Sequence, residues 1–553
     1  MKNPSRMKYN DFNVSGQIVD VLNAEIFPST LHVLNGKIAE IIRGPVSSDQ
    51  FILPGFVDAH VHIESSMLVP SEFARLAVVH GTVATVSDPH EIGNVLGVPG
   101  VEYMIQNGNQ VPFKFFFGAP SCVPATPFET AGAEINAEDL EDLLQRGEIK
   151  YLAEMMNWPG VLHDDPLVAQ KLTLAHKFGK VVDGHAPGLR GEQARRYAAA
   201  GISTDHESFT EEEARDKLAA GMKILIREGS AAKNFEALAP LLPDFADRLM
   251  FCSDDKHPDN LVEGHLNLLV KRALARQVDL LQVLRIACVN PVLHYGLEVG
   301  LLQLNDPADF IIVDDFAEMR VRKTYINGQL VAEDGHTKIG SIAVPVVNKF
   351  EAREKKPEQF RLPSAGVGLL RVIEAYDGQL VTGQLMLPPR VEDGNAVSDP
   401  ERDVLKLAVV NRYQDAPPAL SFIRNFNLKR GAIASSVGHD SHNILAVGTD
   451  DVSICRAVNR VIQSKGGISV VDGDEEQVLS LPVAGIMSAA DGYQVAREYA
   501  ALDAKAKNLG STLASPFMTL SFMALLVIPA LKLSDRGLFD GETFSFVEAL
   551  SER

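Results

Sequence analysis

The chain has 553 residues, too many for one compact core, and at about 150 residues per domain its length predicts three or four units. A composition of 46% hydrophobic and 22% charged residues excludes wholesale disorder. The 72 acidic residues outnumber the 52 Lys and Arg, and a net charge of −20 provides no electrostatic footprint for nucleic acid or an anionic membrane. We therefore expect a soluble protein that binds neither.

The cysteines and the chain ends give information about the compartment. Four cysteines lie far apart without a CxxC pair, which argues against a disulfide framework and favours a reducing environment. The first residues contain no apolar signal segment, so we expect a cytoplasmic protein. The most apolar stretch, residues 517–533, is short for a membrane span and contains Pro529 and Lys532, so we expect a buried helix there.

Two segments that flank the middle of the chain share a strand pattern. Both alternate apolar and polar residues, and both contain an Asn-Gly pair, which is typical of a tight β-hairpin. We therefore expect residues 1–50 and 300–345 to form one small β domain assembled from both flanks. The two pairs are Asn35-Gly36 and Asn327-Gly328.

Between these flanks, residues 51–299 alternate apolar strand-like runs with helical segments, many of which end in Gly. Eight such units over about 230 residues predict a (β/α)₈ barrel. A doubly wound sheet is the alternative, but eight consecutive parallel strands favour the closed form. The predicted strands cover residues 51–62, 82–91, 113–121, 150–156, 180–186, 202–208, 222–230 and 249–255.

The remainder of the chain reads as a further unit. Residues 346–365 are polar and charged, as in a linker, and residues 366–553 alternate strands with helices, which predicts a C-terminal α/β domain. Neither GxxxxGK[ST] nor a GxGxxG after a strand occurs, so a phosphate-cradling fold is unsupported.

One cluster in this unit, GHDSHN, gathers His439, Asp440 and His442. It is compatible with a metal site or with a lid that reaches the barrel face. A turn whose side chains bond locally is the more common case, and it is the interpretation we favour.

Histidines and carboxylates fall at the ends of the predicted barrel strands. These ends meet at one face of a barrel, where such folds carry their chemistry. Unpaired polar groups beside apolar strands would be costly, and divalent metals are natural partners for imidazole and carboxylate. The His60-Val61-His62 spacing places both imidazoles on one side of a strand, so both can bind one ion. The predicted metal ligands are His60, His62, Glu154, His185, His206 and Asp254.

This series resembles the amidohydrolase superfamily, and its finer wording is similar to the adenine deaminase family. The motifs that carry the resemblance are PGFVDAHVHIESS (54–66), DPHEIGNV (88–95), SCVPA (121–125), LAEMM around Glu154, DGHAPGL from Asp183, IREGSAA (226–232), SDD (253–255) and, less specifically, LPVAGIMS (481–488). The resemblance implies two divalent ions. It places the HxH pair and Asp254 on one ion and the histidines of strands five and six on the other, with Glu154 bridging them. It also implies manganese or iron(II), whereas the ligand types alone would equally suit zinc.

The resemblance further implies hydrolysis of a free purine base, adenine, to hypoxanthine and ammonia, with a metal-bridging hydroxide attacking C6. We expect Glu91 to donate a proton to N1 and Asp254 to carry a proton to the departing amine. His90 would bond the purine or orient the nucleophile. The alternative is that Glu91 is a carboxylate in the first turn of a helix with no catalytic role. Supporting or substrate-binding roles are predicted for Asp88, Ser121, Arg227, Glu228 and Asp255.

Several alternatives stay open. Asp88 could cap the following helix, and Arg227-Glu228 could be a structural ion pair. At the level of function they are a cyclic-amide hydrolase of the dihydroorotase or hydantoinase kind, a deaminase of another aminopurine or a pterin, and a non-enzymatic metal-binding or purine-binding protein. We also expect a homo-oligomer, with a dimer as the first guess.

Overall fold

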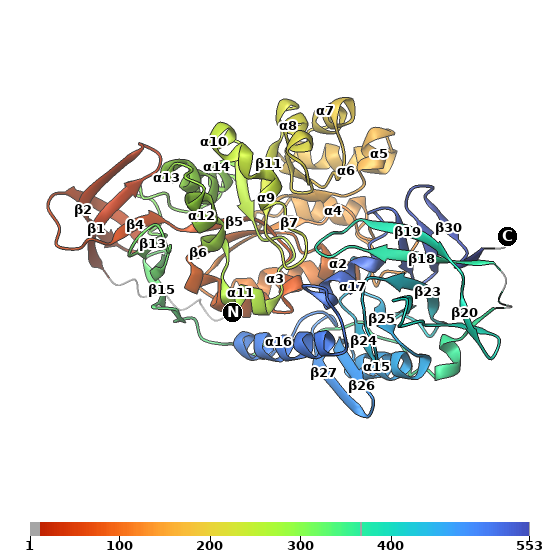
Figure 1. Ribbon diagram of the computed structural model, residues 1–553. Helices are drawn as coiled ribbons and strands as arrows, with labels where there is room; N and C mark the ends of the chain where they lie inside the picture. The colour runs from red at the N-terminus through yellow and green to blue at the C-terminus, as the bar shows by residue number, and fades with distance from the viewer. Residues whose placement is uncertain (1–10, 365, 367, 552–553) are drawn as a thin grey trace.

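The computed structural model describes residues 11–364, 366 and 368–551, arranged as a flanking sheet, a central barrel and a C-terminal domain (Figure 1). In the described chain the flanking sheet has eight strands in the order β16-β15-β14-β13-β4-β1-β2-β3. Strands from both flanks meet where β13 pairs antiparallel with β4. The strands are β1 (Phe12–Asp20), β2 (Glu25–Leu34), β3 (Lys37–Arg43), β4 (Phe51–Pro54), β13 (Phe310–Val313), β14 (Val321–Ile326), β15 (Gln329–Glu333) and β16 (His336–Thr337).

Both predicted Asn-Gly hairpins are confirmed. Asn35 and Gly36 join β2 to β3 with φ of 53° and 77°, and Asn327 and Gly328 join β14 to β15 with φ of 47° and 72°. A two-residue turn with both residues in the left-handed region matches the twist of the flanking strands, and Asn and Gly tolerate that conformation best.

The central region is a closed barrel of parallel strands. Its described strands form one arc, β5 to β9, and a second arc, β10 to β12. Parallel bridges from Val182 to Ile202 and from Val61 to Asp254 join the two arcs into a ring. The strands are β5 (Phe56–Val61), β6 (Thr82–Ser87), β7 (Lys114–Ala119), β8 (Ile149–Met155), β9 (Val181–Gly184), β10 (Thr204–Asp205), β11 (Lys223–Arg227) and β12 (Leu249–Cys252).

One predicted strand differs, because residues 51–62 are split at Gly55. Residues before it belong to β4 of the flanking sheet, and those after it form β5 of the barrel. A Cβ at Gly55 would lie 2.3 Å from a methyl carbon of Val83 in the neighbouring strand β6. The chain therefore passes from one sheet to the other at a point that only glycine fits.

Helices surround the barrel strands, and several end at a left-handed glycine, as predicted. Gly179, Gly201 and Gly221 follow α6, α7 and α8 with φ of 64°, 91° and 98°. The helices of this region are α1 (Pro70–Ala77), α2 (His90–Leu96), α3 (Val98–Gly108), α4 (Ala137–Leu144), α5 (Trp158–Leu162), α6 (Pro166–Lys177), α7 (Gly191–Ala199), α8 (Glu211–Ala219), α9 (Phe235–Leu238), α10 (Leu242–Phe245), α11 (Pro258–Glu263), α12 (Leu266–Ala275), α13 (Leu280–Leu284) and α14 (Asn290–Tyr295).

The C-terminal domain is built on a mostly antiparallel sheet in the order β19-β18-β23-β22-β25-β24-β26-β27, with β31 beside β18. Figure 1 shows this domain lying against one side of the barrel. Its elements are β17 (Leu362–Pro363), β18 (Leu369–Ala375), β19 (Thr382–Leu387), β20 (Arg390–Glu392), β21 (Asn395–Val397), β22 (Leu405–Val410), β23 (Ala419–Arg424), β24 (Ala432–Ser435), β25 (Ile444–Gly448), α15 (Asp451–Gln463), β26 (Gly467–Asp472), β27 (Glu475–Ser480), α16 (Gly492–Asn508), α17 (Pro516–Ser521), β28 (Leu531–Ser534), β29 (Gly537–Asp540), β30 (Ser545–Val547) and β31 (Leu550–Ser551).

This sheet is the middle layer of the domain. Along β22 the side chains alternate between two cores: Leu407 joins the core shared with the barrel, and Ala408 joins the core under α15. The same alternation holds in β24, where Ile433 faces the barrel side and Ala434 faces α15. Because successive strand residues point to opposite faces, small residues on one face let the helix approach closely.

Two expectations for the C-terminal part need correction. The buried helix expected over residues 517–533 is much shorter: α17 ends at Ser521, and the chain enters β28 at Leu531. The polar linker is not detached, because Glu351 and Ala352 donate backbone hydrogen bonds to the Arg412 carbonyl, and Phe360 is fully buried under α15. A few anchoring residues are enough to pack a segment whose average composition is polar.

Across the described residues, every helix is too short or too polar to traverse a bilayer.

Candidate metal centre

The six predicted metal ligands come together at the carboxyl ends of the barrel strands, and all are buried. His60 lies within β5, His62 directly follows it, and Glu154 lies within β8. The remaining three follow β9, β10 and β12 within two residues: His185, His206 and Asp254. Parallel strands bring these ends to one face of the barrel.

The barrel closes at this same place. The Asp254 amide donates to the His60 carbonyl at 3.0 Å, and the His62 amide donates to the Asp254 carbonyl at 3.4 Å. Asp254 has a φ of 53°, in the left-handed region that Asp tolerates better than most residues. The backbone contact that seals the ring therefore also aims the Asp254 carboxylate at the two histidines.

A first group of ligand atoms surrounds the Nε2 atom of His62. It lies 3.1 Å from Nε2 of His60, and 3.3 Å from both Oδ1 of Asp254 and Oε1 of Glu154. These distances are short enough for all four atoms to bind one ion between them.

A second group surrounds the other oxygen of Glu154. Its Oε2 lies 2.8 Å from Nδ1 of His185 and 3.2 Å from Nε2 of His206. Glu154 thus presents one carboxylate oxygen to each group, which is the arrangement expected of a residue that bridges two cations.

The hydrogen bonding of His62 tests whether a cation fits here. Its Nδ1 lies 3.2 Å from the carbonyl of Asp88, which can only accept, so Nδ1 carries a proton. In neutral His62 the lone pair is therefore on Nε2, facing the carboxylates of Asp254 and Glu154. Acceptors directed at one another need a positive charge between them, and the imidazole and carboxylate donors suit a divalent metal.

The titration of the histidines has the same cause. Burial lowers the pKa of His62, but hydrogen bonds to Asp254 and Glu154 outweigh it and raise that pKa well above its ordinary value. Burial also opposes the charge on His206, yet Glu154 raises its pKa to about 9. The carboxylates thus favour a cation, a proton or a metal ion, at both groups.

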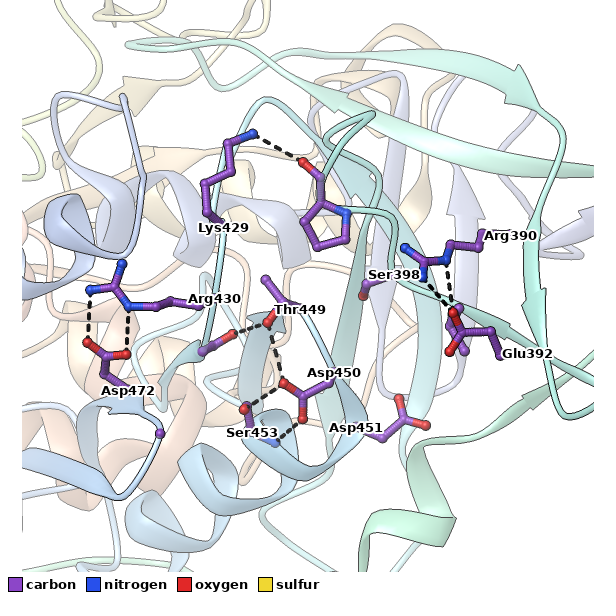
Figure 2. Close-up of a pocket in the computed structure, with 14 residues that line it drawn as sticks. Arg390, Glu392, Ser398, Lys429, Arg430, Thr449, Asp450, Asp451, Ser453 and Asp472 are labelled. Carbon is purple, nitrogen blue, oxygen red and sulfur yellow. Dashed lines mark hydrogen bonds and ion pairs between the residues drawn. The ribbon is translucent and has the colours of Figure 1, made fainter.

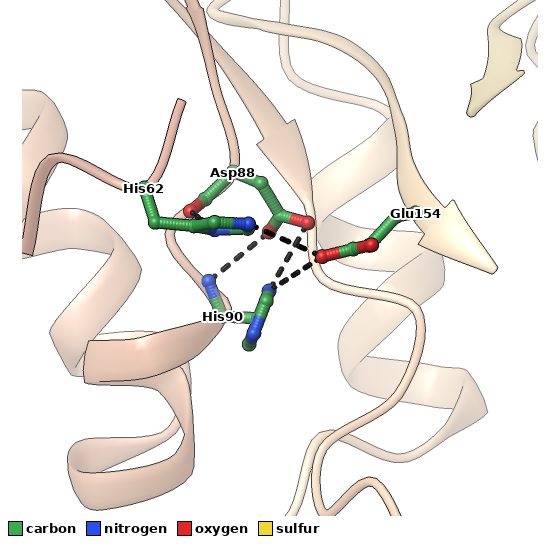
Figure 3. A group of neighbouring side chains, drawn as sticks. All are labelled: His62, Asp88, His90 and Glu154. Atoms are coloured by element: carbon green, nitrogen blue, oxygen red, sulfur yellow. Dashed lines mark hydrogen bonds and ion pairs between the residues drawn. The ribbon is translucent and has the colours of Figure 1, made fainter. Parts of the chain in front are cut away.

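Asp88 and His90 lie beside the first group (Figure 3). The His90 amide donates to Oδ1 of Asp88, and Nδ1 of His90 lies 3.1 Å from Oδ2 of Asp88 and 3.6 Å from Oε1 of Glu154. Asp88 therefore orients His90 and, through its carbonyl, His62. These contacts fit the predicted role of Asp88 as a residue that orients the histidines better than they fit its predicted role in substrate binding.

Glu91, at the start of α2, is held by two histidines of the C-terminal domain. Nδ1 of His439 donates a very short hydrogen bond to Oε1, and Nε2 of His442 contacts Oε2. The turn interpretation that we favoured for GHDSHN is therefore wrong, since these side chains cross to the barrel. Burial opposes ionisation, but His439 and His442 hold the pKa of Glu91 well below its usual range. The two histidines thus favour the carboxylate form of Glu91, and its role as a proton donor stays a prediction.

Arg227 links Glu207 to the metal centre, and the sequence analysis did not predict Glu207 as a site residue. Its guanidinium binds Glu207 through both nitrogens, at 2.5 and 2.9 Å, and reaches Oδ2 of Asp254 at 2.6 Å. Oε1 of Glu207 lies 3.5 Å from Nε2 of His206 and 3.6 Å from Nδ1 of His185. The sequence did contain one indication of this role, because Glu207 directly follows the predicted ligand His206 at the end of a strand.

Other predicted site residues lie in different surroundings. Ser121 donates a 2.5 Å hydrogen bond to the backbone carbonyl of Glu154 and lines a separate cavity. Glu228 pairs with Arg272 at 2.6 Å, whereas Arg227 pairs with Glu207 and Asp254, so the alternative of an Arg227-Glu228 ion pair is wrong. Asp255, in contrast, lines the cavity at the metal centre, where Ser65 donates to it.

A larger cavity, of about 640 Å³, lies in the C-terminal domain away from these ligands (Figure 2). Four of its charged groups pair with one another: Arg430 with Asp472 at 2.8 Å, and Arg390 with Glu392 at 2.6 Å. Mutually neutralised side chains offer a ligand little, so the metal centre is the better candidate for chemistry.

A barrel with this ligand set at its strand ends defines the class of metal-dependent amidohydrolases. Residues 51–331 match the model of the amidohydrolase family, and residues 379–545 match that of the adenine deaminase C-terminal domain. The chain is 58% identical to the adenine deaminase of Salinibacter ruber, an alignment that covers 97% of this chain and 98% of that protein.

Two further relatives are similar over nearly their whole length. The adenine deaminase of Sulfurovum sp. is 56% identical over 96% of this chain and 98% of its own, and that of Methanosarcina mazei is 51% identical over 97% and 99%. The chain therefore belongs to the adenine deaminase family of the amidohydrolases.

Proposed function

We propose that this chain hydrolyses adenine to hypoxanthine and ammonia, and so acts in purine metabolism. The observation that carries the proposal is Glu154, which presents one oxygen to each of two histidine groups at the barrel mouth, beside the buried carboxylate of Glu91. Near full-length identity with adenine deaminases supports the choice of substrate. The alternative of a cyclic-amide hydrolase finds no such support among these relatives.

Two divalent ions, manganese or iron(II) with zinc as an alternative, are proposed as cofactors. His60, His62 and Asp254 would hold one, His185 and His206 the other, and Glu154 both. Such ions would lower the pKa of a bound water to about 7 and so supply a nucleophile at neutral pH.

The two proton-transfer residues then have distinct tasks. Glu91 is ionised at rest, so it accepts the first proton of the water as oxygen adds to C6, and it returns that proton to N1 of the ring. Asp254 accepts the second proton and delivers it to the amino group, and the bond from C6 to nitrogen breaks. One water thus provides the new oxygen, the proton on N1 and the third hydrogen of ammonia. Each transfer contributes about 10²–10⁴-fold to the rate.

His90, Asp88 and Arg227 act on these groups indirectly. His90 lies 3.7 Å from Oε1 of Glu91 and 3.6 Å from Oε1 of Glu154, so it stands between the proton carrier and the bridging ligand. Arg227 occupies Oδ2 of Asp254 and leaves Oδ1 directed at the ligand group. This fixes which Asp254 oxygen faces the reaction.

The test is ammonia release from a panel of adenine, adenosine, guanine and hydantoin by the metal-loaded protein, with metal content measured on the same sample. We expect release from adenine and about two ions per chain. Turnover of adenosine or guanine instead would transfer the proposal to another aminopurine, and ring opening of hydantoin would replace it. Bound metal without turnover of any compound would favour a binding protein.

A further inference from the structure

The loop between β24 and β25, residues 436–443, enters the barrel mouth from the C-terminal domain, beside Leu380, Phe522 and Leu525. It delivers His439 and His442 to Glu91, 348 and 351 positions earlier in the chain. Both histidine side chains are buried, and His439 lines the cavity at the metal centre. The barrel alone therefore does not complete the surroundings of Glu91.

The loop is held from several sides. The Arg412 guanidinium donates to the His442 carbonyl at 3.3 Å, and the Tyr413 hydroxyl donates to the Ser441 carbonyl at 2.6 Å. Asn443 donates to the carbonyl of Thr130, in the barrel, at 3.0 Å. Side chains fixed by such a shell can hold a partner within a fraction of an ångström.

His442 has a defined tautomer. The amide of Gly438 donates to Nδ1 of His442 at 3.2 Å, so Nδ1 holds a lone pair. The ring proton is therefore on Nε2, which contacts Oε2 of Glu91. The loop's own backbone thus sets which nitrogen of His442 carries the proton that faces Glu91.

His439 uses its other nitrogen. Because a carboxylate only accepts, Nδ1 of His439 donates to Oε1 of Glu91. The ring stacks on Phe522 with centroids 5.1 Å apart, and the His439 amide donates to the Ser521 carbonyl at 3.1 Å. The two histidines therefore bind the two oxygens of one carboxylate through different ring nitrogens.

We propose that His439 and His442 are positioning residues for Glu91, so that the C-terminal domain completes the proton-transfer part of the active site. By binding both oxygens they fix the carboxylate plane and aim it at the reacting base. The inference rests on the proposed function, because it assigns Glu91 a proton to carry.

Asn and Gln substitutions separate the two ring nitrogens. The amide nitrogen of Asn falls near the position of Nδ1, and that of Gln near Nε2. On full-length, metal-loaded protein with adenine, we expect His439→Asn to keep most of kcat and His439→Gln to lose about 10²-fold, with KM changed less than about threefold. At position 442 the order reverses: His442→Gln keeps activity and His442→Asn loses it.

The same ranking at both positions, or a loss in KM alone, would overturn the proposal. A further check introduces His439→Gln into the Glu91→Gln variant. The second substitution should then cost no additional activity, because both changes remove the same proton transfer by Glu91. An undiminished extra loss would mean that His439 acts on the substrate by itself. Melting temperature and metal content separate these effects from misfolding, and His336→Gln, at an exposed position in β16, is the matched control.

A readout independent of turnover separates this inference from the proposed function. Imidazole ¹⁵N spectra should show a signal from a histidine protonated on Nε2 only that disappears in His442→Gln and shifts in Glu91→Gln. If the wild-type protein released no ammonia from adenine, the proposed function would fail while these shifts could still hold. Spectra of His442 unchanged by Glu91→Gln would overturn the contact itself.

Discussion

The barrel mouth and the loop that faces it supply different parts of one site. The barrel contributes metal ligands from strand ends, each placed by its own strand and by the closure of the ring at Asp254. The loop of residues 436–443 contributes two histidines that bind a carboxylate and no predicted ligand. The comparison teaches that the candidate metal ligands and the partners of Glu91 come from separate domains, which substitutions can probe one at a time.

Removal of the bridging residue should have the largest effect. Glu154→Ala deletes the oxygen that each ligand group shares, so we expect at most one tightly held ion and a loss of activity of at least about 10⁴-fold. Metal analysis after gel filtration and an ammonia assay measure both. The control is Glu148→Ala, an exposed carboxylate ahead of the same strand. Two retained ions would contradict the bridging role.

Glu91→Gln should separate metal binding by the barrel from proton transfer by Glu91. The substitution keeps the shape of the side chain and lies outside both ligand groups, so we expect an unchanged metal content and a fall in kcat of about 10²-fold or more. Steady-state kinetics beside metal analysis tests this. A near-normal rate would remove Glu91 from the reaction, and loss of metal would place it among the ligands.

Acidification should weaken metal binding at the ends of the barrel strands. The pKa of His206 is raised to about 9 in the metal-free protein, so at neutral pH a metal must displace its proton. Metal binding should therefore release protons, and affinity should fall about tenfold for each pH unit per displaced proton. Calorimetry in buffers of different ionisation enthalpy, between pH 6 and 8, measures this. Loading that is independent of pH and buffer would contradict the assignment.

The smallest effect on activity should come from the far face of the C-terminal sheet. Ile454 lies on the inner side of α15 and is fully buried against the sheet, so Ile454→Ala should destabilise the protein by about 2–5 kcal/mol while kcat changes less than about twofold. Urea unfolding and kinetics test this, with Val452→Ala on the exposed side of α15 as the control. A large loss of kcat at unchanged stability would show that this face influences the loop.

Residues next to one another in the chain show where prediction stops. Arg227 ends β11 with its side chain in the metal centre, whereas Glu228 turns to Arg272 on the outside. Alternation along a strand predicts that the two point to opposite sides, but the sequence does not state which one faces inward. The sequence likewise predicted a role for Ser121 at the site but not its hydrogen bond to the backbone carbonyl of Glu154.

The sequence by itself determined the elements with a local cause: the Asn-Gly hairpins, the glycine-ended helices, and the strands that carry His60, His62 and Glu154 to one face. These follow from backbone preferences and side-chain alternation within a few residues. Only the tertiary structure decided that the ring closes through Asp254, that Glu207 binds Arg227, and that His439 and His442 cross to Glu91. Such contacts join positions hundreds of residues apart, and they depend on how whole sheets pack, which local propensity does not encode.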